Sequence, residues 1–107
     1  MSENKDLLLK MLADEPKLYN IINSKEHLLV LEILEKDNKN FQFIKNVLEK
    51  DIYIKKDIII YNILDSLIDN DLIKKIKVNE SDIYFLTEKG KSFLKLFKQT
   101  KQEFSLM

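Results

Sequence analysis

The sequence contains no cysteine, one glycine and one proline. The lack of cysteine excludes a disulfide scaffold and any metal site built on thiolates. The scarcity of glycine and proline leaves few tight loops and favours a mainly helical chain. No apolar run approaches the roughly 20 residues that span a bilayer, and the first residues lack the features of a signal peptide. We therefore expect a soluble, cytoplasmic protein without a membrane partner.

Net charge is also missing, because 18 basic residues balance 18 acidic ones. A strongly basic composition is the usual mark of general nucleic-acid binding, so its absence argues against a nonspecific coat protein. Binding through local basic groups remains open. The length of 107 residues indicates one domain, and the 45% of hydrophobic residues are enough to build a real core.

Motifs for catalysis are absent as well. No Gly-rich nucleotide loop, Ser/His/Asp set or cluster of metal ligands is visible. His27 is the only histidine, and no cysteine is present to share a metal with it. The i, i+4 pair of Asp65 and Asp69 is better explained as an exposed helix face than as a cation site. We predict that the chain is not an enzyme and holds no metal or cofactor.

The stretch from Asp57 to Gly90 organises the rest of the chain. Its first part carries apolar residues at three- and four-residue steps, which place them on one helical face: Ile60, Ile63, Leu64 and Leu67. Residues 74–78 and 83–86 have strand character, and the polar residues 79–82 form the turn of an antiparallel hairpin. Thr87 is placed to cap a final helix.

Further helices are predicted before this stretch. Ser24 is placed to cap a helix over 25–36, and Asn40 is placed to cap one over about 41–50. The predicted fold is mainly α with a small antiparallel β-hairpin: a winged helix-turn-helix with additional N-terminal and C-terminal helices. The expected parts are an N-terminal helical extension over 1–23, the winged helix-turn-helix core over 24–87 and a C-terminal helix over 88–107.

The end of the chain resembles many small prokaryotic winged-helix regulators, in which a strand ending in Tyr and a Leu-Thr pair leads into Glu-Lys-Gly and an apolar helix. The matching residues are Tyr84, Leu86, Thr87, Glu88, Lys89 and Gly90. The segment ILDSLIDNDLI is similar to the end of their recognition helix, with Asp71 where those proteins usually have Gly. Over about Leu28 to Phe104 the sequence resembles the archaeal winged-helix DNA-binding family that dimerises through a long C-terminal helix. The resemblance implies double-stranded DNA and a second copy of the chain as partners.

Two groups of residues are predicted to contact DNA. Lys55 and Lys56 precede the 57–69 helix, where a recognition helix first meets DNA, and Tyr61 and Asn62 are placed to reach base edges. Three lysines of the hairpin are placed to hold phosphates: Lys74, Lys75 and Lys77. Residues 51–70 carry four Asp and two Lys, a local balance of minus two that repels phosphates. Ordinary solvated surface is therefore the alternative for both groups.

A stripe at four-, three- and four-residue steps runs along the last helix, close to a coiled-coil seam: Phe93, Phe97, Thr100 and Phe104. We predict that it mediates homodimerisation, and the alternative is core within one chain. Near the N-terminus, apolar residues wrap much of the helix over 6–12, so one of its flanks also needs a partner beyond the local core.

These features predict a sequence-dependent or architectural double-stranded DNA-binding protein that acts as a dimeric transcription regulator. The alternative is a winged-helix protein–protein interaction module. Its basis is the acidic, Ile-rich outward face of the 57–69 helix, where Ile58, Ile59 and Tyr61 would form an apolar docking patch.

Overall fold

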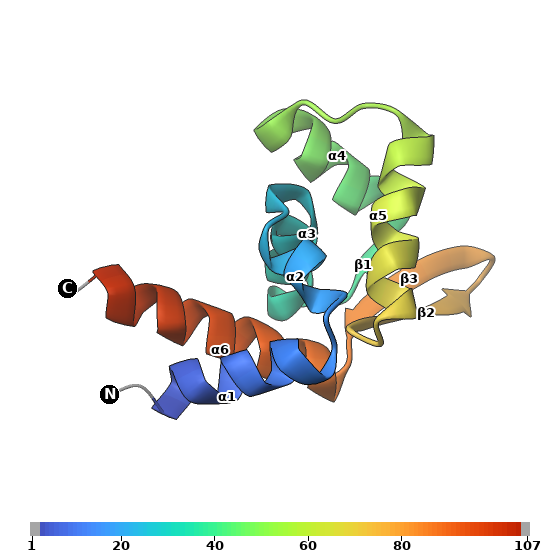
Figure 1. Ribbon diagram of the computed structural model, residues 1–107. Helices are drawn as coiled ribbons and strands as arrows, with labels where there is room; N and C mark the ends of the chain where they lie inside the picture. The colour runs from blue at the N-terminus through green and yellow to red at the C-terminus, as the bar shows by residue number, and fades with distance from the viewer. Residues whose placement is uncertain (1–2, 106–107) are drawn as a thin grey trace.

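The computed structural model describes residues 3–105, with side chains for residue 3 and residues 5–101. This part of the chain is mainly helical, with a short strand after the third helix and a hairpin before the last helix (Figure 1). They are α1 (Glu3–Asp14), α2 (Leu18–Ile22), α3 (Lys25–Lys36), β1 (Lys39–Asn40), α4 (Phe41–Ile52), α5 (Asp57–Asp69), β2 (Ile73–Val78), β3 (Ser81–Leu86) and α6 (Glu88–Ser105). No helix within residues 3–105 is long and apolar enough to cross a membrane.

Helix α3 lies at the centre and packs against α2, α4, α5, α6 and β3. Its start is fixed by Ser24, whose side chain accepts a hydrogen bond from the backbone N–H of His27 at 3.3 Å. Helix α4 begins in the same way, with Asn40 accepting from Phe43 at 2.9 Å. Both predicted caps are confirmed, because each polar side chain satisfies one of the N–H groups that a helix start leaves unpaired.

The hairpin of β2 and β3 forms the wing. Strand β1 pairs with the other edge of β3, which gives the strand order β1-β3-β2. All pairs are antiparallel, from Ile73 opposite Leu86 to Val78 opposite Ser81. The predicted hairpin is confirmed, but its turn is shorter than expected. Asn79 and Glu80 have φ angles of 49° and 67°, and two left-handed residues close a hairpin without further loop.

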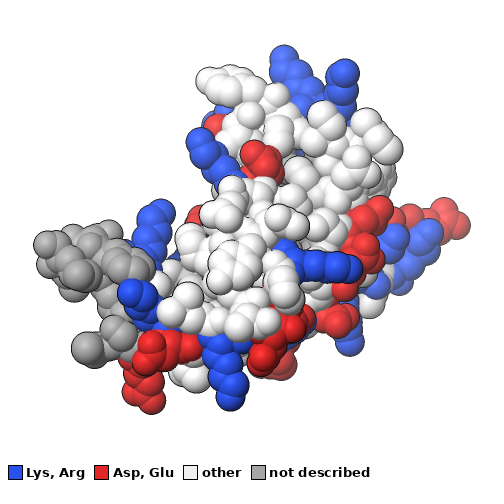
Figure 2. Space-filling model, viewed as in Figure 1, with Lys and Arg blue, Asp and Glu red and all other residues white. Residues whose placement is uncertain are grey.

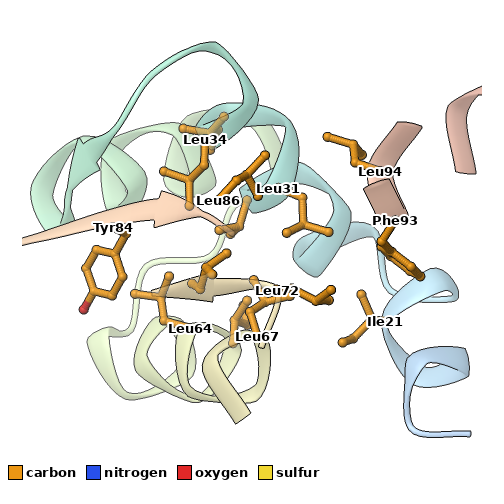
Figure 3. Close-up of a cluster of buried hydrophobic side chains, with 14 of the residues drawn as sticks. Ile21, Leu31, Leu34, Leu64, Leu67, Leu72, Tyr84, Leu86, Phe93 and Leu94 are labelled. Carbon is orange, nitrogen blue, oxygen red and sulfur yellow. The ribbon is translucent and has the colours of Figure 1, made fainter. Parts of the chain in front are cut away.

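One hydrophobic core joins the helices to the sheet (Figure 3). The inward positions expected on α5 are all buried: Ile60, Ile63, Leu64 and Leu67. Tyr84 closes the core under the wing, and its burial, with the nearby charge of Asp82, raises the pKa of its phenol to about 12. The Tyr84 side chain is therefore neutral at physiological pH.

The start of α6 is clamped to the turn after α5. Thr87 accepts a hydrogen bond from the N–H of Gly90 at 2.9 Å, which confirms it as the cap of α6, and donates one to the carbonyl of Asp71 at 2.6 Å. Gly90 lies so close to Leu72 that a Cβ would stand 2.0 Å from the Leu72 carbonyl oxygen. Asp71 has a φ of 59°, so it adopts the left-handed conformation that the related sequences give to Gly.

Helix α1 packs along α6 in the antiparallel direction (Figure 1). The pair extends to one side of the molecule, where both chain ends lie. We call this pair the arm. At its base Glu15 forms an ion pair with Lys89. The arm lengthens the molecule, whose extents are 45 × 25 × 23 Å, and it brings the N-terminal extension and the C-terminal helix together.

Candidate nucleic-acid interface

Helix α5 presents one face to the core and the other to solvent. Ile60 and Leu64 are fully buried, whereas Ile58 is 65% exposed and Asn62 and Asp65 are also exposed. The helix lies at one side of the molecule, next to the wing (Figure 1). Its outward side chains are therefore free to meet a partner, as the sequence pattern predicts.

The N-terminal end of α5 is basic. Lys55 and Lys56 are exposed and directly precede the first turn. The acidic residue of that turn, Asp57, is paired with Lys45 of α4 at 2.8 Å. This hydrogen bond and charge raise the pKa of Lys45, which therefore stays protonated and offsets the Asp57 carboxylate. The remaining charge at this end of the helix comes from the two lysines.

The acidic residues of α5 are concentrated in its other half, at Asp65 and Asp69. Figure 2 shows basic side chains at the connection between α4 and α5, and acidic side chains at the opposite end of α5, near the wing. The local balance of minus two is thus an average over two regions of opposite sign. A phosphate backbone meets favourable charge only at the N-terminal half.

The two residues that are predicted to contact bases differ in how much of the side chain is available to a partner. Asn62 is exposed, and its amide is of a type that pairs well with adenine in the major groove. The ring of Tyr61 stacks on Phe41 of α4, with centroids 4.4 Å apart and planes at 16°. Tyr61 is therefore held against α4 and offers a partner only part of its surface.

The three lysines of the wing lie on two faces of the sheet. Lys75 and Lys77 are directly opposite Tyr84 and Asp82, so they share the face that turns toward α5. Lys74 is opposite Phe85 and lies on the other face. All three are exposed, but the structure brings only Lys75 and Lys77 to the side of α5.

The predicted dimerisation stripe does not form one exposed seam. Phe93 is fully buried within its own chain, which leaves it no surface for a second subunit. Within the arm itself, Thr100 is also buried and Phe97 is partly buried. The side chain of Phe104 lies outside the described residues. Phe93 thus follows the alternative interpretation, core within one chain.

Sequence reasoning missed three residues at this surface. Lys45 lies 12 positions before Asp57, and no local pattern signals a pair at that distance. Lys39 places its ammonium 4.3 Å from the centre of the Phe43 ring. Tyr53 is 82% exposed at the end of α4, with a left-handed φ of 60°. No local sequence pattern predicts this conformation, because bulky aromatic residues seldom adopt positive φ.

Comparison with known proteins gives a consistent result. No protein-family model matches the sequence, and no curated protein matches it. Among solved structures, a PadR family transcription regulator from Clostridium difficile is 26% identical, with a TM-score of 0.68 over 77% of this chain and 92% of that one. The chain is a winged-helix protein.

Two further solved structures show the same winged helix. F93 from STIV, described as a winged-helix DNA-binding protein, is 26% identical, with a TM-score of 0.53 over 71% of this chain and 85% of that one. The transcriptional regulator YodB from B. subtilis is 20% identical, with a TM-score of 0.68 over 83% and 86%. The solved structures named here are thus transcription regulators and a DNA-binding protein, and they share the winged-helix fold with this chain. Among the described side chains, those of residue 3 and residues 5–101, no group of three or more acidic or histidine residues could hold a metal ion.

Proposed function

We propose that this winged helix is a transcription regulator that binds double-stranded DNA and inserts the N-terminal half of α5 into the major groove. The observation that carries the proposal is the separation of charge along α5. Lys55 and Lys56 stand at the end that a recognition helix presents to DNA. Asp57, the one acid at that end, is paired with Lys45.

Backbone groups support the same orientation. Lys56 is the N-cap residue of α5 and, in the described part of the chain, makes no side-chain cap hydrogen bond. The first N–H groups of the helix are therefore not occupied by a capping side chain, and such groups favour a phosphate. Lys75 and Lys77 of the wing add positive charge on the same side of the molecule.

A duplex-binding measurement tests the proposal. Wild-type protein is expected to bind duplex DNA at about 50 mM salt. The double variant Lys55→Ala/Lys56→Ala should reduce the magnitude of the negative slope of log affinity on log salt by about 1.8, since each phosphate contact contributes about −0.9. Fluorescence anisotropy of a labelled duplex gives both quantities. The matched control, Lys10→Ala/Lys17→Ala, removes two exposed lysines at the N-terminal part of the chain and should leave the slope unchanged. Absence of duplex binding by the wild type would disprove the proposed function.

We also propose that the protein is a homodimer joined through the arm. The flank of α1 that carries Leu7 supports this, because Leu7 is 50% exposed although it lies in the helix of a small domain. Symmetric pairing is the commonest way for a chain to cover such a flank. A dimer would set two α5 helices about 34 Å apart, one turn of DNA.

A second candidate function has its own observation. Ile58, Ile59 and Tyr61 are large apolar side chains that remain exposed in the first half of α5, and an exposed apolar patch suits a protein partner. The double variant Ile58→Ser/Tyr61→Ser separates the candidates, with folding checked by circular dichroism. Under the proposed function it weakens duplex binding. If duplex binding is unchanged while a protein partner is no longer captured, the interaction module is the better description.

A further inference from the structure

The first two turns of α5 expose uncharged side chains between two charged regions. Lys55 and Lys56 directly precede the helix, whereas Asp65 and Asp69 lie in its other half. Figure 2 shows uncharged surface between the basic side chains at the α4–α5 connection and the acidic side chains at the opposite end of α5. In the proposed complex this surface faces the base edges of the major groove, so its chemistry sets which base pairs the protein prefers.

The middle of this outward face is formed by Ile58 and Asn62. Each lies two residues from the fully buried Ile60, and successive residues of an α-helix are about 100° apart, so both side chains point away from the core. The exposed fractions agree with this geometry, because Ile58 is 65% exposed, against 42% for Ile59 and 41% for Tyr61 at the two flanks. Ile58 and Asn62 are therefore the two side chains of these turns that a facing partner meets first.

These two side chains suit the two bases of an A·T pair. In the major groove thymine presents its 5-methyl group, which apolar side chains contact, and adenine presents a donor and an acceptor that pair with the amide of Asn. Guanine is contacted mainly by Arg or Lys, and α5 contains neither between Asp57 and Asp69. The outward chemistry of α5 thus matches A·T pairs and lacks the groups that favour G·C pairs.

The spacing and the surrounding charge are also those of a duplex contact. Ile58 and Asn62 are four residues apart, or about 6 Å along the helix axis, and successive bases of one DNA strand are about 3.4 Å apart, so the two side chains reach base pairs about two steps apart or closer. The ammonium groups of Lys55 and Lys56 beside them are complementary to DNA phosphates. Building on the proposed function, we infer that the protein selects operators with A·T pairs at this position, where Ile58 contacts a thymine methyl group and Asn62 pairs with adenine.

Selection of bound duplexes from a pool with a randomised centre, followed by single-base replacement, tests the inference on the full chain. We expect the selected duplexes to share a motif of A·T pairs. Replacing each thymine of the motif in turn by uracil, which lacks only the 5-methyl group, should identify one at which affinity falls about fourfold, the effect of one buried methyl group. Replacing the A·T pair at Asn62 by G·C should weaken binding about fivefold or more. Uracil outside the motif is the control and should leave the affinity unchanged.

The variant Ile58→Ser connects the methyl effect to one side chain. It should bind the thymine and uracil duplexes equally, with folding checked by circular dichroism. Ile76→Ser is the matched control, because Ile76 is 47% exposed but lies opposite Ile83, on the sheet face that carries Lys74 and turns away from α5. This control should keep the difference between the thymine and uracil duplexes at the wild-type value.

The outcomes separate this inference from the proposed function. A selected motif of G·C pairs, equal binding of the thymine and uracil duplexes by the wild type, or a thymine preference that survives Ile58→Ser would each overturn the inference. Duplex binding is intact in these outcomes, so the proposed function stands and the apolar surface of Ile58 is available to a protein partner. Absence of any bound duplex overturns the proposed function, and the inference with it.

Discussion

Gly90→Ala is expected to destabilise the protein by about 3 kcal/mol or more, a large loss for the addition of one methyl group. The new Cβ would stand 2.0 Å from the Leu72 carbonyl oxygen, 3.0 Å from the Leu72 carbonyl carbon and 3.2 Å from Leu86 Cδ2. Two of these atoms belong to the backbone, so a side-chain rotation cannot relieve the overlap. The start of α6 must move away from β2, which breaks the hydrogen bond from Thr87 N–H to the Leu72 carbonyl.

Thermal unfolding followed by circular dichroism measures this effect. For a domain of this size, about 3 kcal/mol lowers the melting temperature by about 12 °C or more. Ser92→Ala is the matched control, because Ser92 lies two residues further along the same helix and is exposed. Its substitution should change stability by less than about 0.5 kcal/mol. A melting temperature of Gly90→Ala within 2–3 °C of the wild type, as roughly expected for an ordinary surface change, would contradict the close approach of α6 to Leu72.

Raising salt from about 50 to 200 mM should weaken duplex binding about 150-fold for each bound subunit. The structure places four lysines on the side of α5, and four phosphate contacts give a slope of about −3.6 in log affinity against log salt. Those lysines are Lys55, Lys56, Lys75 and Lys77. A salt titration by fluorescence anisotropy gives the slope directly.

Two neighbouring lysines of β2 provide the control for this slope. Lys75→Ala should lower its magnitude by about 0.9. Lys74→Ala removes the same charge from the same strand but from the other face of the sheet, so its slope should stay at the wild-type value. If the two substitutions reduce the slope equally, the wing approaches DNA by its edge. The claim that only the sheet face with Lys75 meets DNA is then wrong.

The helices were predictable from sequence because their signals are local. Ser24, Asn40 and Thr87 each accept a hydrogen bond from the backbone N–H three residues ahead. The residue type and its position therefore indicate where the helix begins. The buried face of α5 follows from its apolar spacing in the same way. Only β1 was missed, because a strand of two residues has no periodicity to detect.

The surface was less predictable because it depends on residues that meet only in the folded chain. Lys45 offsets the one acidic residue in the first turn of α5, Asp57, yet the two residues belong to different helices. The stripe that starts at Phe93 has the spacing of a dimer seam, but a helix packed on its own core has the same spacing. Phe93 is fully buried within its own chain, so it belongs to the core. A periodic pattern gives the apolar face and leaves open which surface covers it.

The double role of Thr87 ties the geometry of the arm to that of the recognition helix. Its hydroxyl donates to the Asp71 carbonyl in the turn after α5 and accepts from the Gly90 N–H in the first turn of α6, so one side chain joins the two helices across the wing. We therefore expect a tilt of α6 to shift the end of α5. In the proposed dimer joined through the arms, a small change of angle within the arm would change the spacing of the two α5 helices on DNA. It would thereby change which operator sequences the dimer fits.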